Sequence, residues 1–228
     1  NDMAILYGVG VGSGDPELMT LKAVRVIQEC EVIVVPSQDI MKSVAYNIAV
    51  KAVPEIDKKE LMGIHMPMSK DENSLKNAHA GAANMIMEQL AKGKNVAFLT
   101  LGDPTIFSTY TYIQEMVESH GYKTQIINGI ASFLAAASHL NKKLVVRDET
   151  LHIIPSTYGI SEAIALSGTK VFMKAGKKMS DIKKMLAGTD KKAYFIENCG
   201  MENEIIIEGI DDMPDTAGYY SMVIVSDK

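Results

Sequence analysis

Short apolar runs alternate with amphipathic helical stretches along most of the chain. The first run, Ala4–Tyr7, is followed by residues 19–30, where Lys22, Arg25 and Glu29 form one polar stripe. Because the runs are short, rich in β-branched residues and followed by helical patterns, they predict parallel strands joined by helices. Further strands are expected at 32–35, 95–100, 124–127, 152–154, 170–173 and 193–197, and helices at 42–52, 72–92, 104–119, 131–139, 161–167 and 180–187.

The end of the chain follows a different pattern. Two apolar runs, Glu204–Glu208 and Tyr219–Ser226, have no helical stretch between them, which predicts an antiparallel pair. His120-Gly121-Tyr122 lies between a predicted helix and a predicted strand, so the expected lobes are 1–119 and 120–228. The predicted fold is α/β, with two lobes, mostly parallel sheets and some antiparallel pairing near the C-terminus.

Composition narrows the class of protein. Of the 228 residues, 47% are hydrophobic and 22% are charged, which is typical of a soluble globular protein. No apolar run approaches the roughly 20 residues that span a bilayer. The first residues do not resemble a secretory signal either, so a cytoplasmic protein is predicted. The net charge of −5 argues against a nucleic-acid-binding protein.

Cysteine and histidine spacing indicates no metal site held by the protein. Cys30 and Cys199 are far apart in the sequence and are interpreted as buried thiols of a reducing compartment. The five histidines show none of the paired spacings that metal sites use. The prediction is therefore that the protein contributes no metal site.

A glycine-rich segment, Gly8–Asp15, directly follows the first predicted strand. Alternate glycines let a ligand approach the backbone, whose N–H groups can bind anionic oxygens. The spacing does not fit a dinucleotide fingerprint, and Val35-Pro36-Ser37 lacks the acidic residue expected after the second strand. No Gly-Lys-Ser/Thr follows, which excludes a P-loop. A tight turn with Pro16 near a helix start remains possible, but a ligand loop of another kind is favoured.

Two more loops follow predicted strands and have a similar form. Leu101–Phe107 follows the strand at 95–100, and Asn128–Ser132 follows the strand at 124–127. Asp103 before Pro104 is also explained as a helix N-cap followed by proline at the first helical position. Because ligands of open α/β sheets bind beyond the carboxyl ends of strands, the two loops together predict a cofactor site.

The three motifs together resemble the ordered signatures of the tetrapyrrole methylases. They are Gly-x-Gly-x-Gly-x-Gly-Asp-Pro-x-Leu-x-Thr-Leu-Lys-Ala (8–23), Gly-Asp-Pro-x-x-Phe-Ser (102–108) and Asn-Gly-Ile-Ala-Ser (128–132). Their order and spacing fit nearly the whole chain. Further segments are similar to the members of this family that methylate C-20 of cobalamin precursors: Val34–Pro36, Ile154–Ser156, Val171–Lys174, Ile196–Met201 and Tyr219–Met222.

The resemblance implies an S-adenosylmethionine-dependent C-methyltransferase that acts in cobalamin biosynthesis. The implied substrate is cobalt-factor II or precorrin-2, methylated at C-20, and the implied assembly is a homodimer with the cofactor held between the lobes. Implied substrate contacts are Gly10, Gly12, Ser13 and Gly14. Carried over position by position, the implied cofactor contacts are Leu101, Gly102, Asp103, Ile106, Ala131, Ser132, Met173, Lys174 and Cys199.

The sequence departs from the family at two positions. Ser13 stands where many relatives have proline, and Pro36 stands where uroporphyrinogen-methylating relatives carry an aspartate implicated as a base. No base is therefore transferred to that position. An electron-rich meso carbon is itself nucleophilic, so alignment supplies much of the acceleration. Asp15, Tyr110 and Tyr112 are candidates for accepting the displaced proton, although each is also explained as a cap or packing residue.

Two alternatives remain open. One is methylation at another ring position of a corrinoid or porphyrinoid precursor. The other is a nucleotide-cofactor-binding α/β protein without methyl chemistry, against which the broken dinucleotide fingerprint argues.

Overall fold

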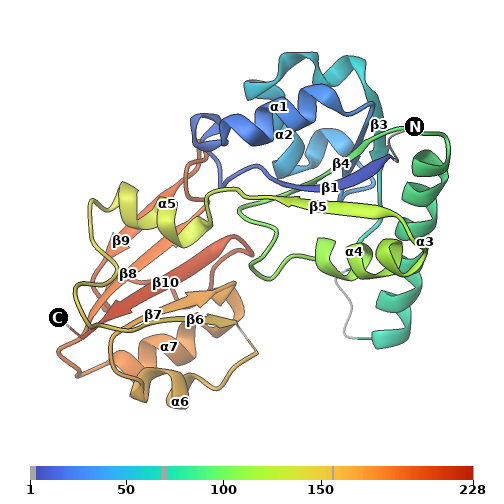
Figure 1. Ribbon diagram of the computed structural model, residues 1–228. Helices are drawn as coiled ribbons and strands as arrows, with labels where there is room; N and C mark the ends of the chain where they lie inside the picture. The colour runs from blue at the N-terminus through green and yellow to red at the C-terminus, as the bar shows by residue number, and fades with distance from the viewer. Residues whose placement is uncertain (1–3, 68–70, 156, 228) are drawn as a thin grey trace. The chain divides into compact units, whose positions relative to one another are not determined.

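The computed structural model describes residues 4–67, 71–155 and 157–227, and the chain forms two compact units. The first unit ends at Ala131 and the second begins at Ser132, each with its own sheet (Figure 1). The boundary predicted near residue 120 falls inside the first unit, because the strand at 123–127 pairs with the first strand of the chain. Ser156, in one of the segments similar to C-20 methylating enzymes, lies outside the described residues.

The sheet of the first unit is wholly parallel. Its strands follow the order β3-β2-β4-β1-β5. Because the strands of a parallel sheet all run in the same direction, the segments that follow them lie at one edge of the sheet. The strands are β1 (Ile5–Gly10), β2 (Val32–Val35), β3 (Glu60–Gly63), β4 (Val96–Thr100) and β5 (Lys123–Ile127).

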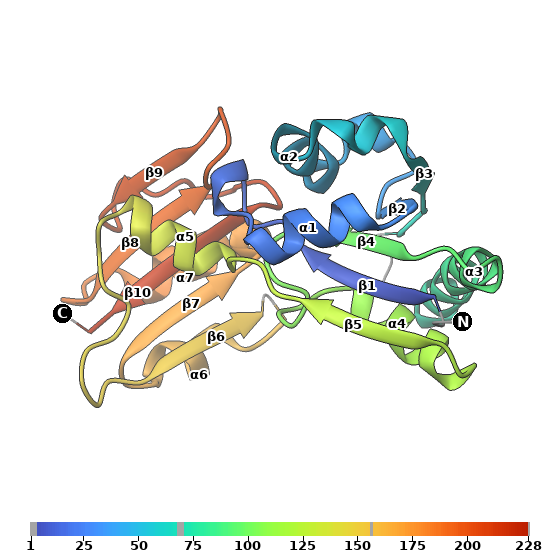
Figure 2. The same cartoon turned by 45° about the horizontal axis from the view of Figure 1, so that its top comes forward.

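Helices cover both faces of this sheet (Figures 1 and 2). Apolar residues of α1 (Leu21–Glu29) and α2 (Val44–Ala52) pack on one face, and those of α3 (Glu72–Ala91) and α4 (Tyr110–Ser119) pack on the other. This double cover explains why β2 and β4 are buried throughout and consist of apolar residues except for Thr100. The described residues of the unit also form the short 3₁₀ turns η1 (Pro16–Leu18), η2 (Ile40–Lys42) and η3 (Pro54–Lys58).

Several local features of the first unit differ from the sequence-based expectation. Gly8 and Gly10 belong to β1 rather than to the loop after it. The helix expected from Pro104 begins only at Tyr110, because Phe107 adopts a left-handed conformation (φ 49°) that interrupts any helix. Strand β3 was not predicted, since Glu-Leu-Met-Gly lacks β-branched residues and is placed by its pairing with β2.

The second unit contains a mixed sheet with the order β6-β7-β10-β8-β9. Strands β6 and β7 are parallel, whereas the other neighbouring pairs are antiparallel. The last two strands do not pair with each other as the sequence predicted, because β8 lies between them and is antiparallel to both. The strands are β6 (Leu151–Pro155), β7 (Thr169–Met173), β8 (Lys192–Glu197), β9 (Ile205–Glu208) and β10 (Ser221–Ser226).

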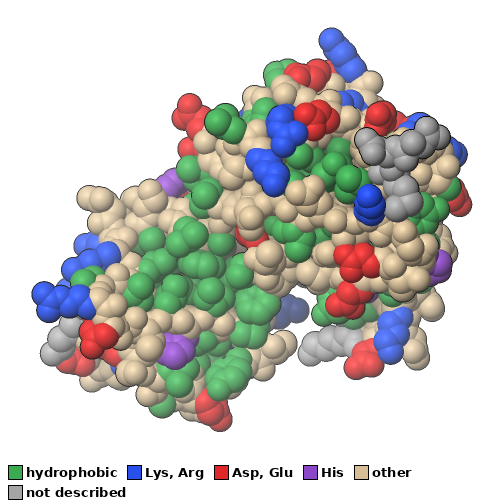
Figure 3. Space-filling view, viewed as in Figure 1, with side chains coloured by type: hydrophobic (Ala, Val, Ile, Leu, Met, Phe, Trp, Pro, Cys, Tyr) green, Lys and Arg blue, Asp and Glu red, His purple; other side chains and the backbone are tan. Residues whose placement is uncertain are grey.

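The helices of the second unit are shorter. Apolar residues of α6 (Ile160–Ala165) and α7 (Met179–Leu186) form a core with β7, β8 and β10, and η4 (Ala175–Lys178) leads into α7. Helix α5 (Ser132–His139) lies beside β8 in both ribbon views. The space-filling view shows apolar side chains gathered on the visible face of this unit (Figure 3). None of the described helices of the chain is both long enough and apolar enough to span a membrane.

A wholly buried lysine is held at the end of the second sheet. The Lys170 ammonium group donates to the Leu166 carbonyl at 2.9 Å and to Asp227 Oδ1 at 2.8 Å, and Lys191 pairs with the same carboxylate. Burial raises the pKa of Asp227, but the two lysines and the Gly168 N–H outweigh it and hold this pKa well below its usual range. The carboxylate thus compensates a buried positive charge.

Asp227→Ala is expected to lower the free energy of unfolding by about 2 kcal/mol at neutral pH. Breaking a fully buried pair costs roughly 3–5 kcal/mol, and the expected loss is smaller because the Asp227 side chain is 41% exposed. The exposed Asp212→Ala is the control. Since the folded-state pKa of Asp227 is depressed, its contribution is present above about pH 4 and disappears as the pH falls towards the lowered pKa. Urea unfolding at several pH values measures this, and equal stability of the two variants would contradict the pairing.

Candidate active site

The three motifs meet at the carboxyl edge of the first sheet. Strand β1 lies between β4 and β5, so the segments after these three strands are neighbours. The Val11 N–H donates to the Thr100 carbonyl at 3.0 Å. Gly12 and Gly102 exchange backbone hydrogen bonds of 3.2 and 2.7 Å, which join the first two motifs directly.

Glycine is required at this edge chiefly for backbone packing. A Cβ atom on Gly10 would lie 2.6 Å from both the Gly102 carbonyl oxygen and the Gly129 nitrogen. A Cβ on Gly129 would lie 2.2 Å from the Gly102 carbonyl oxygen. Gly8 has a different role, because its Cβ would lie 2.2 Å from the Tyr110 ring. The absence of a side chain at Gly8 and Gly10 therefore allows close packing within the unit. The prediction of contact with a ligand now rests on residues 11–15.

Asp103 ties the second motif to the third. Its Oδ2 accepts hydrogen bonds from Asn128 Nδ2 and from the Gly129 N–H, both at 3.0 Å. Its Oδ1 accepts from the Thr105 N–H at 2.8 Å and from the Thr105 hydroxyl. The carboxylate is therefore bound from both sides by two loops, and only 7% of the residue is exposed.

These contacts keep Asp103 ionised. Burial raises its pKa, but the hydrogen bonds from Thr105, Asn128 and Gly129 outweigh that effect, and the pKa lies below its ordinary value. A carboxylate offers about four acceptor positions, and four donors within the first unit already occupy them. Asp103 therefore caps the turn at Thr105 and not the N-terminus of a helix. Because its acceptor positions are filled, direct pairing of this carboxylate with a ligand cation is disfavoured.

Ser13 has a hydroxyl group that its surroundings leave available. The residue is 3% exposed, and among the described residues its Oγ has no hydrogen-bond partner. Leaving a buried hydroxyl unpaired costs about 1–3 kcal/mol, which a bound acceptor would recover. Gly12 and Gly14, on either side, are also buried.

The two catalytic candidates occupy different environments. Asp15 Oδ1 accepts from the Glu17 N–H at 2.9 Å, so this residue caps η1. The sequence predicts such a cap as the alternative to a catalytic role. Tyr110 is fully buried in the core between the sheet and α3 and α4, where it contacts Phe98 and Gly8. Burial also raises the pKa of Tyr110, so its hydroxyl stays protonated and has no capacity to accept the displaced proton. Tyr112 is 57% exposed and its ring stacks on His79. The burial of Tyr110 therefore argues against its predicted role as proton acceptor, which stays a prediction.

Tyr110→Phe is expected to leave the methyl transfer implied by the resemblance unchanged and to alter the free energy of unfolding by less than about 1 kcal/mol. The reason is that the ring supplies the packing, whereas the buried hydroxyl adds little. Steady-state kinetics and urea unfolding measure the two effects. A large loss of kcat in a stably folded Tyr110→Phe protein would support the predicted catalytic role of Tyr110.

The remaining cofactor candidates divide between the units. In the first unit Leu101 and Ile106 are half-buried, while Ala131 is buried. In the second unit Ser132 begins α5, Met173 ends β7 and Cys199 follows β8. Lys174 is left-handed (φ 56°), and its ammonium nitrogen lies 5.1 Å from the centroid of the Tyr219 ring, a cation–π contact. Sequence reasoning missed Thr105 and Asn128 as partners of Asp103, although both belong to the quoted motifs.

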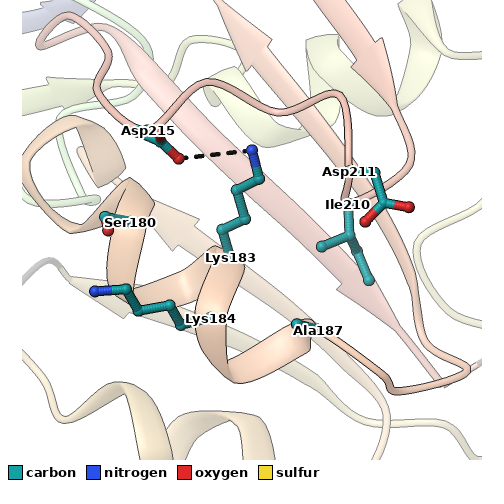
Figure 4. Close-up of a pocket in the computed structure, with 7 residues that line it drawn as sticks. All are labelled: Ser180, Lys183, Lys184, Ala187, Ile210, Asp211 and Asp215. Carbon is teal, nitrogen blue, oxygen red and sulfur yellow. Dashed lines mark ion pairs between the residues drawn. The ribbon is translucent and has the colours of Figure 1, made fainter.

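The second unit contains a pocket with no predicted site residue in it (Figure 4). Its volume is about 350 Å³. Lys183 points across it to Asp215 at 3.5 Å and donates to the Met213 carbonyl at 2.7 Å, so its charge is already compensated. The pocket is therefore not assigned to the active site. Its lining consists of Ser180, Lys183, Lys184, Ala187, Ile210, Asp211 and Asp215.

Comparison with known proteins places the chain in a family. The model of the Tetrapyrrole (Corrin/Porphyrin) Methylases matches residues 5–210. The probable cobalt-precorrin-2 C(20)-methyltransferase of Methanocaldococcus jannaschii is 34% identical over 229 residues, which cover 96% of this chain and 95% of that protein. The precorrin-2 C(20)-methyltransferase of a Sinorhizobium species is 28% identical and covers 96% of this chain and 94% of its own.

Solved structures agree on the fold. A putative cobalamin synthesis related protein from Corynebacterium diphtheriae has a TM-score of 0.80 at 18% identity, covering 99% of both chains. Uroporphyrin-III C-methyl transferase from Thermus thermophilus, solved with S-adenyl homocysteine, has a TM-score of 0.74 at 18% identity, covering 98% of this chain and 92% of that one. The sequence match over residues 5–210 and this shared architecture show that the chain belongs to the tetrapyrrole (corrin/porphyrin) methylases.

Proposed function

We propose that the protein transfers the methyl group of S-adenosylmethionine to C-20 of cobalt-factor II in cobalamin biosynthesis, with precorrin-2 as the alternative substrate. The observation that carries this proposal is the 34% identity, over nearly the full length of both chains, to a protein named for C(20) methylation of cobalt-precorrin-2. A 28% identical relative is named for the cobalt-free substrate, so the ring position has more support than the metal. Family membership argues against a nucleotide-binding protein without methyl chemistry.

The proposed cofactor contacts in the first unit fit the chemistry of S-adenosylmethionine. Leu101 and Ile106 are half-buried apolar side chains that can cover its apolar portions, and Gly102 has no side chain that would block its approach. Asp103 acts as a positioning residue, because its carboxylate fixes the loops at Thr105 and Gly129. The bound cofactor supplies an electrophilic methyl group on a sulfonium. The proposed contacts at Ala131, Ser132, Met173, Lys174 and Cys199 rest on the resemblance.

The proposed substrate wall consists of Gly12, Ser13 and Gly14. The Ser13 hydroxyl is a donor without a partner among the described residues, which suits an acidic macrocycle that brings acceptor oxygens. Alignment of the meso carbon with the methyl group is the main demand of the displacement, and it can lower the barrier by several kcal/mol, on the order of 7–11 at most. Asp15 remains the proposed acceptor of the displaced proton.

An anaerobic assay tests this function. The purified protein receives S-adenosylmethionine with cobalt-factor II or precorrin-2 in parallel reactions, and mass spectrometry follows the products. We expect cobalt-factor II to gain one methyl group faster than precorrin-2. Methylation of neither macrocycle would contradict the proposal, whereas a preference for precorrin-2 would overturn only the choice of substrate.

We further propose a cytoplasmic homodimer, as the family resemblance implies. Sedimentation velocity at micromolar concentration is expected to give a particle of twice the mass of the 24.8 kDa chain. A particle of monomer mass at every concentration would contradict this part of the proposal.

A further inference from the structure

Three side chains of the second unit bring metal-binding donor atoms together. His139 ends α5, Cys199 follows β8, and Glu204 directly precedes β9. One imidazole nitrogen, the cysteine sulfur and one carboxylate oxygen all lie within 4.8 Å of one another. The His139 and Glu204 side chains are already in contact, with Nδ1 2.7 Å from Oε2.

The backbone around this cluster holds the donors in place. Asn198 and Gly200, on either side of Cys199, both have positive φ angles (53° and 76°), so the chain turns sharply at the cysteine. The Gly200 N–H donates to Glu204 Oε2 at 2.6 Å, which orients the carboxylate. The Asn198 N–H donates to the Tyr220 carbonyl at 3.0 Å and ties the turn to the residue before β10.

The three side chains of the cluster differ in their exposure to solvent. Cys199 is 4% exposed, whereas the side chains of His139 and Glu204 are 30% and 24% exposed. A cation could reach the cluster from the solvent side and meet a sulfur at its base. A fourth ligand, such as water, could occupy the open side.

We propose that His139, Cys199 and Glu204 form a zinc-binding site. Thiolate, imidazole and carboxylate are the three ligand types that Zn²⁺ accepts, whereas Mg²⁺ and Ca²⁺ prefer oxygen ligands alone. Bonds of about 2.0–2.3 Å place the donors of a tetrahedral zinc site within about 4 Å of one another. The donors of this cluster lie within 4.8 Å, so small side-chain rotations are enough to bring them to those separations.

Binding exchanges protons for the metal. The Cys199 thiol gives its proton to solvent and coordinates as thiolate, and the His139–Glu204 contact is exchanged for bonds to zinc. The site uses only the Cys199 side chain, so a cofactor contact at this residue would use its backbone. The sequence showed no such site because the three residues are distant along the chain and have no motif spacing.

Cobalt(II) is a suitable probe because a cobalt–thiolate bond produces a charge-transfer absorption band. The reduced full-length protein, freed of metal with a chelator, is titrated with Co²⁺ under anaerobic conditions and then with Zn²⁺. We expect one equivalent of cobalt to produce the band and one equivalent of zinc to remove it. Cys199→Ser should abolish the band, and His139→Gln should weaken zinc binding more than about tenfold.

Cys30→Ser is the matched control, because Cys30 is the second cysteine of the chain and is buried in the core of the first unit. It should leave both the band and the zinc affinity unchanged. Thermal melting of His139→Gln without metal checks that this substitution of a partly exposed side chain leaves the fold intact. No band in the wild type, a band that survives Cys199→Ser, or zinc affinity unchanged by His139→Gln would each overturn the site and show that the cluster is a hydrogen-bonded network only.

Discussion

Gly129→Ala is expected to disrupt the packing of the first unit and to abolish measurable S-adenosylmethionine binding. The added Cβ would lie 2.2 Å from the Gly102 carbonyl oxygen and 2.8 Å from the Gly10 carbonyl carbon. Overpacking ordinarily costs about 1–3 kcal/mol, when side chains can move aside. Here the neighbours are backbone atoms of two strand ends, so the free energy of unfolding should fall by more than about 3 kcal/mol.

Gly81→Ala provides the matched control for this prediction. Gly81 is exposed on α3, and nothing lies within 4 Å of the position of its missing Cβ. Alanine in a helix interior should therefore raise the free energy of unfolding by roughly 0.5–1 kcal/mol and leave cofactor binding unchanged. Urea unfolding and isothermal titration calorimetry measure both effects. Wild-type stability of Gly129→Ala would contradict the close approach of the three motifs.

Asp103→Ala is expected to weaken S-adenosylmethionine binding about 10- to 100-fold. The substitution removes the acceptor of all four hydrogen bonds that join Thr105, Asn128 and Gly129. A hydrogen bond to a charged group contributes roughly 1.5–3 kcal/mol, and about 1.4 kcal/mol is a tenfold change in affinity. The loss stays within this range because the exposed Thr105 and Asn128 can bond to water instead. The loops should move apart, so the loss acts through their position rather than through a charge lost from the cofactor.

Two further variants separate these causes. Asp103→Asn keeps the shape of the side chain, but its amide nitrogen cannot accept a hydrogen bond, so one of the two loops loses its contact. An intermediate loss of affinity is expected. Asp71→Ala removes an aspartate that caps α3 through Ser74, at 2.9 Å, and should lower stability by about 1 kcal/mol without changing the affinity. Unchanged affinity in a folded Asp103→Ala protein would exclude Asp103 from the cofactor site.

The sequence predicted the parallel strands β1, β2 and β4 with their helices, and it predicted that the loops after the strands at 95–100 and 124–127 act together. Strands such as 95–100 are short, apolar and followed by helical patterns, and these local features determine parallel pairing. The predicted helix of residues 19–30 is also present, with Ala23 and Ile27 buried and Lys22 exposed. The hydrogen bonds between Gly12 and Gly102 lie just beyond the paired ends of β1 and β4, which are neighbours in the sheet.

The errors came from contacts between residues distant in the sequence. The strand at 123–127 joins the first sheet through β1, and the insertion of β8 separates the last two strands. Neither pairing leaves a signal in local hydrophobic periodicity. Gly8 was interpreted as a ligand-loop residue, whereas the ring of Tyr110 fills the space beside it.

The cluster of His139, Cys199 and Glu204 also depends on contacts between residues that are distant in the sequence. Its members come from α5 and from the connection between β8 and β9, and only the folded unit brings their donor atoms within 4.8 Å. Asp103 presents the opposite case. The sequence motif predicts a ligand contact at Asp103, and the structure adds four hydrogen bonds to this carboxylate, from which we propose that it positions the two loops.

The position of the transferred methyl group tests the central claim most directly. The protein is incubated anaerobically with cobalt-factor II or precorrin-2 and with S-adenosylmethionine that carries ¹³C in its methyl group, and the product is examined by NMR. The proposed function predicts a single labelled methyl group attached to C-20 of the macrocycle. Label at any other carbon would contradict C-20 methylation, and no label in the macrocycle would contradict its methylation altogether.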